Sequence, residues 1–359
     1  MIVMNRKEGR YKDSLLSLLM LFITVPILTS CDRENIDFAE KIPISFTGSV
    51  ETKALISDSD VTGIQKTGIG VTAYIQQGNN VNPVMKNQQV TYSDGDGKWT
   101  YSPVSYWSKS DKYIFTAYAP FSSTTATDLN AATMTFKDIP QYQSVMTDYE
   151  KEKAIDILTD TKVGSYQKEF SNGKVQFELK HELAYLEIRA VKADIVSMRN
   201  VEFKVASLIL GDSNNKMAVM VDDREFTKNV LDNTLSTWSS VTYADGKYPL
   251  ISSPLDSEIP NEVENNSLVL SKMLVAPFEF GGNANPHSLA FQITYNKVEG
   301  QNSTNHAITG HAVTINKFEA GKKYIVTLRF NTASKVEINT VVVEDWTTGS
   351  TYEPPVFNW

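Results

Sequence analysis

The feature that most constrains this fold is a two-residue alternation of apolar and polar side chains, which recurs along most of the chain. Successive side chains of a strand point to opposite faces, so such segments predict β-strands with one buried face. We find no amphipathic helix longer than about three turns. The clearest alternating or strand-like segments are residues 42–46, 69–75, 113–119, 175–179, 183–191, 201–210, 268–276, 289–295, 324–330 and 336–343.

Turn-forming sequences separate these segments and suggest how the strands are grouped. Asp94–Gly97, Ser171–Gly173 and Gly281–Asn283 are rich in Gly, Asn and Asp, and residues 331–334 suit a hairpin loop. Many short strands joined by turns predict an all-β fold of the sandwich type. The 329 residues after position 30 exceed one typical domain of ~100–200 residues. We therefore predict two tandem domains, 42–168 and 169–346, with a tail at 347–359 and an irregular insertion at 237–266.

The amino terminus predicts export. A basic leader with Arg6, Lys7, Arg10 and Lys12 precedes a short hydrophobic run, residues 15–28, which is below the ~20 residues of a membrane span. The run ends in Leu28-Thr29-Ser30-Cys31, which resembles a bacterial lipobox, and Cys31 is the chain's single cysteine. Residues 1–30 are thus predicted to be a lipoprotein signal peptide, and residues 31–41 a tether acylated at Cys31. The alternative is an ordinary signal peptide with a chance cysteine.

Charge limits the partners of the exported chain. The whole chain has 34 Lys and Arg against 42 Asp and Glu. Removal of the leader leaves 30 basic and 40 acidic residues, a net charge of −10. Nucleic acid is bound mainly through Lys and Arg, so we expect no nucleic-acid partner. Contact with a lipid bilayer is expected through the acyl chains on Cys31 alone.

No set of residues predicts an enzyme, a metal site or a cofactor. Gly211-Asp212-Ser213 resembles the nucleophile block of GDS-type hydrolases, but no histidine has an aspartate three residues before it. His306 and His311 lack a nearby cysteine or carboxylate cluster of the kind that holds zinc. We therefore expect no catalytic residues, no metal and no cofactor, and we interpret Gly211–Ser213 as a turn.

An aromatic concentration leaves two interpretations open. Trp99 and Trp107 lie close in sequence to Tyr101 and Tyr106. The favoured interpretation is core packing and cross-strand pairing. The alternative is a ligand platform on which Trp99 and Trp107 stack against sugar rings.

Four groups of motifs occur in a fixed order along the chain. They are Ile44-Ser45-Phe46 with Glu51–Ala54; Tyr106–Ser108 with Tyr113–Pro120; Asp156–Leu158 with Val175–Phe177 and His181–Ala184; and Phe318–Leu328 with Val343–Trp346. Together with Cys31, this order resembles the fimbrillin family of Bacteroidia, the major and minor lipoprotein subunits of type V pili. The resemblance implies two transthyretin-like sandwiches of Greek-key type in tandem.

The resemblance also implies a mechanism of assembly. A trypsin-like protease would cut behind the first strand at the outer membrane, and the strand would leave with the lipid. The uncovered sheet edge and groove would then accept a strand from another fimbrial subunit. Mapped onto this chain, the displaced strand is residues 42–47 and carries Ile42, Ile44 and Phe46, and the cut falls between Lys53 and Ala54. Lys53 departs from the arginine that the family usually has, which puts arginine-specific processing in doubt.

The carboxyl-terminal part of the chain would supply the donated strand. Its candidate residues are Val336, Ile338, Val341 and Val343, because Pro354 and Pro355 disfavour regular pairing in the tail. The sequence thus predicts a structural subunit of a fimbria, reaching the outer membrane and cell surface through the periplasm. The alternative is a non-polymerising or tip-located adhesin that binds a glycan or a protein on a host or bacterial surface. The position in the fibre, as stalk, tip or anchor, stays open.

Overall fold

The computed structural model describes residues 41–50, 67–78, 80–93, 98–108, 111–170, 172–195, 200–213, 216–218, 224–232, 234–241, 243–245, 247–251, 253–262, 266–280, 288–332 and 335–346. These residues form strands almost throughout, which confirms the predicted all-β sandwich class. A short helix, α3 (Asp148–Lys153), begins at a capping box between Thr147 and Glu150. The transthyretin-like detail of the fold stays a prediction.

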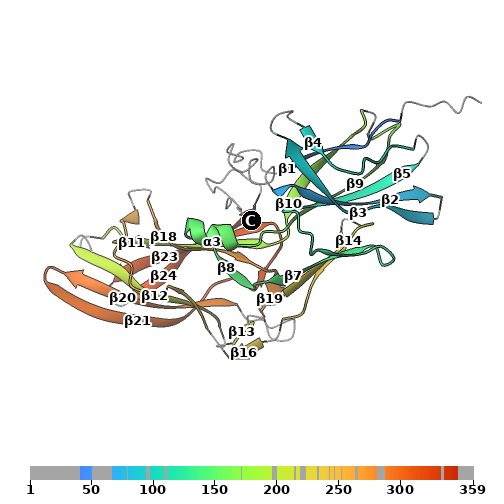
Figure 1. Ribbon diagram of the computed structural model, residues 1–359. Coiled ribbons are helices and arrows are strands. Elements are labelled where there is room, and N and C mark those ends of the chain that lie inside the picture. The colour runs from blue at the N-terminus through green and yellow to red at the C-terminus, as the bar shows by residue number, and fades with distance from the viewer. Residues whose placement is uncertain are drawn as a thin grey trace, which may run out of the picture.

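The amino-terminal part of the molecule is a seven-stranded sheet. Its order is β1-β10-β9-β5-β2-β3-β4, and its strands are β1 (Ser45–Val50), β10 (Lys174–His181), β9 (Leu158–Ser165), β5 (Lys112–Ala119), β2 (Ile69–Gln77), β3 (Asn80–Ser93) and β4 (Lys98–Thr100). The sheet curls, so that β4 and the chain after it return toward β1 (Figure 1). The curl encloses a core to which Val71, Phe115 and Phe177 contribute.

The carboxyl-terminal part is a sandwich of two main sheets. The first has the order β24-β23-β11-β18-β8, with β24 (Lys335–Asp345), β23 (Lys322–Thr332), β11 (Ala184–Lys192), β18 (Leu268–Val275) and β8 (Tyr142–Ser144). The second has the order β17-β12-β20-β21, with β17 (Tyr248–Ile251), β12 (Val201–Asp212), β20 (Leu289–Glu299) and β21 (Asn302–Ala312). Leu186, Phe203, Phe291 and Val326 meet in the core between them.

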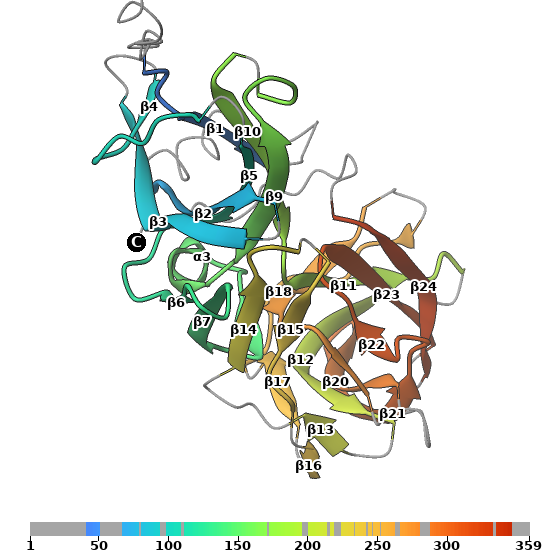
Figure 2. The same ribbon diagram turned by 90° about the vertical axis from the view of Figure 1, so that its right-hand side faces the viewer.

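A smaller sheet lies where the two parts meet. Its order is β15-β14-β7-β6, with β15 (Ser236–Trp238), β14 (Arg224–Asn229), β7 (Thr133–Ile139) and β6 (Ala126–Asp128), and Figure 2 shows it beside both parts. Tyr118 of the seven-stranded sheet and Tyr185 of β11 share a third core cluster with Phe226 of this sheet. Two further strand pairs are β13 (Lys216–Ala218) with β16 (Tyr243–Asp245), and β19 (Phe278–Glu279) with β22 (Lys317–Phe318).

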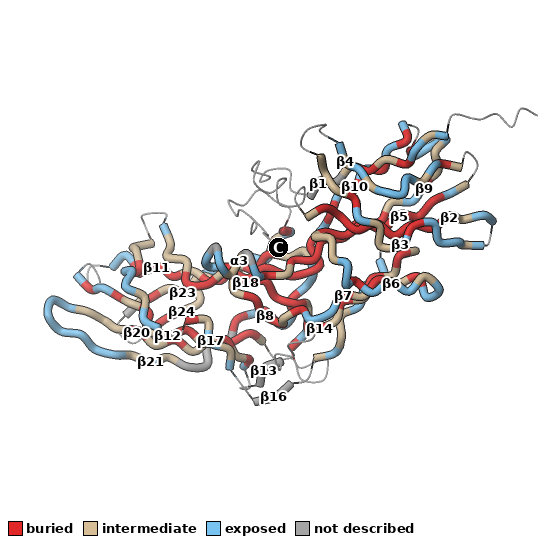
Figure 3. The backbone as a smooth tube through the Cα atoms, in the orientation of Figure 1, coloured by how far each residue is buried: buried red, intermediate tan, exposed pale blue. Residues whose placement is uncertain are grey.

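Burial follows this arrangement. Figure 3 shows buried residues along the strands of both parts and through the region where they meet, whereas the turn of the β20–β21 hairpin and most described residues of β21 are exposed. The predicted division at 168/169 stays a prediction. We note that β10 pairs with β1 and β9, so a division after His181 would keep the seven-stranded sheet whole.

Candidate assembly site

The predicted displaced strand, residues 42–47, lies inside the fold and overlaps β1, which runs from Ser45 to Val50. Ile44 and Phe46 are 1% and 2% exposed, and they belong to the core of the seven-stranded sheet. Ile42 is half-buried and packs against the same core. The intervening Ser45 and Thr47 are more exposed than Ile44 and Phe46, as alternation along a strand requires. The strand therefore presents one apolar face inward.

Two segments flank this strand. On one side β1 runs parallel to β10, in a register that joins Ser45 to Lys174 and Val50 to Leu179. On the other side Ile44 N donates to Ser105 O at 2.9 Å, and Trp107 N donates to Ile42 O at 3.0 Å. We call this place between β10 and residues 105–107 the β1 seat.

Glycine at position 173 shapes one end of the β1 seat. Its carbonyl oxygen accepts from Ser45 N at 3.0 Å, Ser45 Oγ at 3.0 Å and Trp107 Nε1 at 3.2 Å. Gly173 has a φ of +74°, and a Cβ there would lie 3.3 Å from Cγ2 of Ile42. Glycine adopts this conformation without strain, so it holds a carbonyl that receives three donors.

Aromatic rings line the floor of the β1 seat. The ring of Phe46 lies 5.3 Å from Tyr101, 5.7 Å from Phe115 and 5.9 Å from Phe177, measured between centroids. Such distances suit favourable edge-to-face and offset contacts. The hydroxyl of Tyr101 donates to Ile44 O at 2.9 Å. Burial raises the pKa of Tyr101, while its hydrogen bonds to Ser105 act in the opposite direction.

β10 has different neighbours along its length. Residues 174–179 pair with β1, whereas Lys180 and His181 pair with Thr159 and Leu158 of β9. Nearer the middle of β10, Glu178 N donates to Oδ2 of Asp160 at 2.8 Å, so a side chain supplies the acceptor there. The β1 strand is therefore the ladder partner of the first six residues of β10.

The candidate donor residues lie on β24, which is paired within its own sheet. β24 runs antiparallel to β23, in a register from Lys322–Asp345 to Thr332–Lys335. Val336 is buried in the core, Ile338 and Val341 are half-buried, and Val343 is 50% exposed. Their role as a donor strand stays a prediction.

The remaining predicted site residues divide into two groups. Trp107 is 8% exposed and stacks on Phe170 at 5.4 Å, while the half-buried Trp99 packs edge-on against Tyr92. A ligand platform at Trp99 and Trp107 stays a prediction, and Trp99 is its more accessible member. Cys31, Lys53, Ala54 and the tail 347–359 lie outside the described residues.

Within the described ranges, no cluster of three or more His, Cys, Asp or Glu residues is arranged to hold a metal ion. Nor do those ranges contain a helix long and apolar enough to cross a membrane. The interpretation of Gly211–Ser213 as a turn is wrong for its first two residues, because Gly211 and Asp212 end strand β12 and pair with β20; behind them, Ser213 Oγ accepts from Ser288 N at 3.1 Å.

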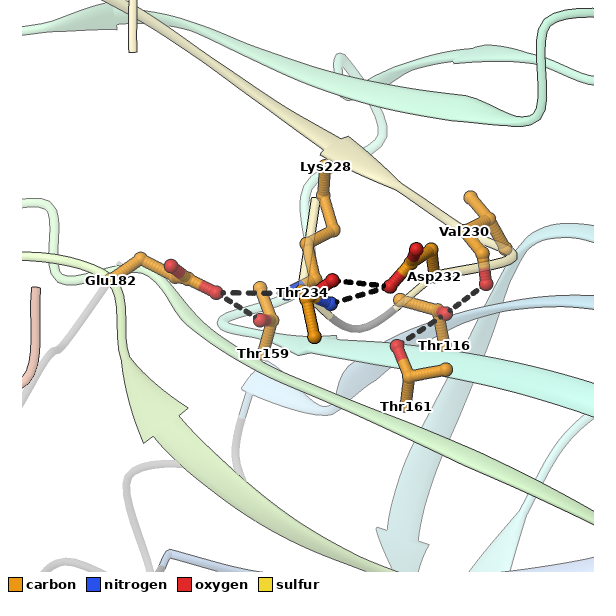
Figure 4. A network of polar contacts seen from close by, with 8 residues as sticks. All are labelled: Thr116, Thr159, Thr161, Glu182, Lys228, Val230, Asp232 and Thr234. Carbon is orange, nitrogen blue, oxygen red and sulfur yellow. Dashed lines mark hydrogen bonds and ion pairs between the residues drawn. The ribbon is translucent and has the colours of Figure 1, made fainter. Parts of the chain in front are cut away.

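Sequence reasoning missed a polar network that joins the smaller sheet to the seven-stranded sheet. Lys228 Nζ of β14 lies 3.4 Å from Oε1 of Glu182, which also accepts from Thr159 Oγ1 (Figure 4). Beyond β14, Val230 O accepts from Thr116 Oγ1 of β5 at 2.9 Å, and Thr116 Oγ1 lies 2.8 Å from Thr161 Oγ1. Glu182 belongs to a quoted motif, but Lys228 carries no signal in the sequence. The network ties the β14 segment to the seven-stranded sheet.

A second missed feature is a contact between three distant motif residues. Asp156 Oδ2 lies 2.7 Å from His181 Nδ1, and the His181 ring stacks on Trp346 at 3.5 Å between centroids, with an interplanar angle of 13°. All three residues are at least nine-tenths buried. They lie in the third and fourth motif groups, so the order of the motifs was a signal, although their contact was not foreseen.

Comparison with solved structures supports this fold. A fimbrial protein from Bacteroides vulgatus is similar, with a TM-score of 0.61 and 19% identity, covering 85% of this chain and 99% of that one. A proposed cell adhesion protein from Bacteroides uniformis has a TM-score of 0.49 and 20% identity, and the match covers 86% of this chain and 99% of that one. A fimbrilin from Porphyromonas gingivalis has a TM-score of 0.36 and 10% identity, and the match covers 85% of this chain and 96% of that one. The last two scores are too low to carry an argument.

Comparison of sequences adds the family. No curated protein matches the chain. A sequence model described as fimbrillin-like matches residues 52–346, from just behind β1 to the tryptophan that stacks on His181. That match spans well over half of the chain, and it agrees with the resemblance carried by the motifs. The chain belongs to the fimbrillin-like family.

Proposed function

We propose that this chain is a structural, non-enzymatic subunit of a cell-surface fimbria, assembled with other fimbrial subunits by exchange of β1. The observation that carries the proposal is the β1 seat. A six-residue strand fills a largely aromatic groove at the end of a sheet, and the family match begins just behind it. Each fully buried apolar side chain that a replacement strand restores contributes ~1.5–3 kcal/mol.

The proposed sequence of events starts at the membrane. The chain is exported through the periplasm as a lipoprotein acylated at Cys31 and reaches the outer membrane. A protease cuts between Lys53 and Ala54, and β1 leaves with the lipid. The exposed edge of β10 and the emptied groove then accept an extended segment from a neighbouring subunit. Residues of β24, with Val336, Ile338, Val341 and Val343, are the proposed donors.

A second candidate function is that of a surface adhesin which keeps β1. A partly open cleft of about 430 Å³ favours it, because small-molecule sites commonly have volumes of ~300–1,000 Å³. Buried polar residues, including Asp160, Glu182 and Lys228, line the cleft. A glycan or a surface protein is the proposed ligand class.

Mass spectrometry of the amino terminus on surface-released protein separates the two functions. Fimbrial assembly requires chains that start at Ala54 and run as multimers, whereas an adhesin that keeps β1 starts at acylated Cys31. Lys53→Gln should abolish both the cut and the multimers. Lys41→Gln is the matched control, because Lys41 is an exposed lysine on the other side of β1. Multimers from uncut Lys53→Gln protein would overturn the proposal.

A further inference from the structure

The contact between Asp156, His181 and Trp346 joins the ends of three chain segments. His181 is the last residue of β10, Asp156 lies two residues before β9, and Trp346 directly follows β24. Trp346 N donates to Gly321 O at 2.8 Å, and Gly321 N donates to Leu183 O at 2.9 Å. The backbone of Trp346 is thus anchored to that of the carboxyl-terminal sandwich. The three side chains therefore connect the end of β10, the strand that pairs with β1, to that sandwich.

The polar part of this contact has little redundancy. Asp156 Oδ2 has His181 as its partner, whereas the other oxygen, Oδ1, is buried with no hydrogen-bond partner. A buried polar group that loses its partner costs about 1–3 kcal/mol, and more when it is charged. Removal of the imidazole would therefore deprive the buried carboxylate of its hydrogen bond and Trp346 of its stacking ring.

The position of His181 matters because of how β10 is held. The ladder pairing of residues 174–179 is with β1, and it ends at Leu179, two residues before His181. If β1 departs, that pairing departs with it. At the far end of β10, the pairing of Lys180 and His181 with β9 and the stack of His181 on Trp346 then remain, together with the hydrogen bond from Glu178 N to Asp160 Oδ2.

We propose that Asp156, His181 and Trp346 form a clasp that holds β10 in place after β1 has left. The empty seat then keeps its shape until another strand arrives. A preformed groove binds a strand more tightly than a collapsed one, because less ordering accompanies binding. The inference rests on the proposed function in one respect, which is that β1 leaves the folded chain.

The test uses the full exported chain, folded with β1 in place and carrying a specific protease site across residues 51–56. After cutting, β1 is removed by dialysis, and hydrogen exchange is measured on the amides of residues 174–181. Binding of a fluorescent peptide with the sequence Ile42–Val50 is then measured. The variants are His181→Ala and the milder Trp346→Leu. His306→Ala is the matched control, because the half-buried His306 lies on β21, in a different sheet from β10, and also stacks on an aromatic ring, that of Tyr295.

The clasp predicts similar exchange in all variants while β1 is present. After β1 is removed, β10 in His181→Ala should exchange at least tenfold faster than in the parent or the control, and peptide binding should weaken at least tenfold. Trp346→Leu should change both quantities in the same direction, which keeps the test valid if His181→Ala does not fold. Equal exchange in parent and variants after removal of β1 overturns the clasp alone. A cut parent that never releases β1 overturns both the clasp and strand exchange.

Discussion

The strands near the two ends of the described chain, β1 and β24, are held by different means. β1 has six residues and runs parallel to β10, and it depends on the buried side chains of Phe46 and of Ile44, the residue directly before it. β24 has eleven residues and pairs antiparallel with β23 along almost its whole length. A two-residue connection, 333–334, joins β24 to β23, whereas residues 51–68 separate β1 from β2.

The comparison shows which strand is easier to remove. One cut behind β1 separates it from the rest of the chain, and its loss breaks a short parallel ladder. Removal of β24 would break a longer antiparallel ladder and expose Val336, which is part of the sandwich core. Parallel pairing is also slightly less stable per residue than antiparallel pairing. Exchange is therefore expected to begin at β1, with β24 or the residues behind it acting afterwards.

The largest effect is expected at the centre of the β1 face. Phe46→Ala removes a buried ring that contacts three other rings, so the free energy of unfolding in urea should fall by about 3–5 kcal/mol. Thr47→Ala is the matched control, since Thr47 is the neighbouring residue on the other face, and it should cost less than about 1 kcal/mol. Equal losses would show that burial is not what holds β1.

A smaller effect should divide β24 into a buried and an exposed half. Val336→Ala removes buried methyl groups, at ~0.8 kcal/mol per group, and should lower the free energy of unfolding by about 1–2 kcal/mol. Val343→Ala, at a residue that is 50% exposed, should change it by less than about 0.5 kcal/mol. In an assembly assay Val343→Ala should nevertheless slow multimer formation. Unchanged assembly would exclude Val343 from the donated strand.

The smallest effect concerns the hydrogen bond from Tyr101 to Ile44. Because burial raises the pKa of Tyr101 above its ordinary value of 10.0, the folded state favours the neutral phenol. The hydrogen bond from the Tyr101 hydroxyl should therefore stabilise β1 fully below pH ~10, and this stabilisation should disappear as the pH rises through the raised pKa of Tyr101. Tyr101→Phe should cost about 0.5–1.5 kcal/mol at neutral pH and abolish this alkaline step in β1 release. Tyr92→Phe, on β3, is the control and should keep the step.

Alternation in the sequence predicted the long strands well. Residues 183–191, 201–210 and 324–330 correspond to β11, β12 and β23, and the hairpin at 331–334 joins β23 to β24. In β12 one face lies in the core, which produces a period of two in the sequence, whereas β11 is buried on both faces and appears as a continuous apolar run. Strands of three or four residues are too short to show a two-residue period. The predicted irregular stretch 237–266 contains β16 and β17, which have three and four residues.

Contacts between segments far apart in the sequence could not be predicted from the apolar and polar pattern of each segment. The pairing of β7 with β14 joins residues about ninety positions apart, and neither strand specifies its partner through its own alternation. The same holds for Asp156, His181 and Trp346, which belong to two separate motif groups along the chain. Their contact depends on how two sheets pack, which is a property of the whole fold.

The carbonyl of Gly173 has a consequence for any fibre built from this chain. It receives two donors from Ser45 and one from Trp107 at the point where β1 enters its place. A strand that replaced β1 one residue out of step would turn its apolar side chains toward water and leave this oxygen without its backbone donor. That single oxygen would then select one register for the inserted strand, and the register sets the distance between successive subunits along the filament.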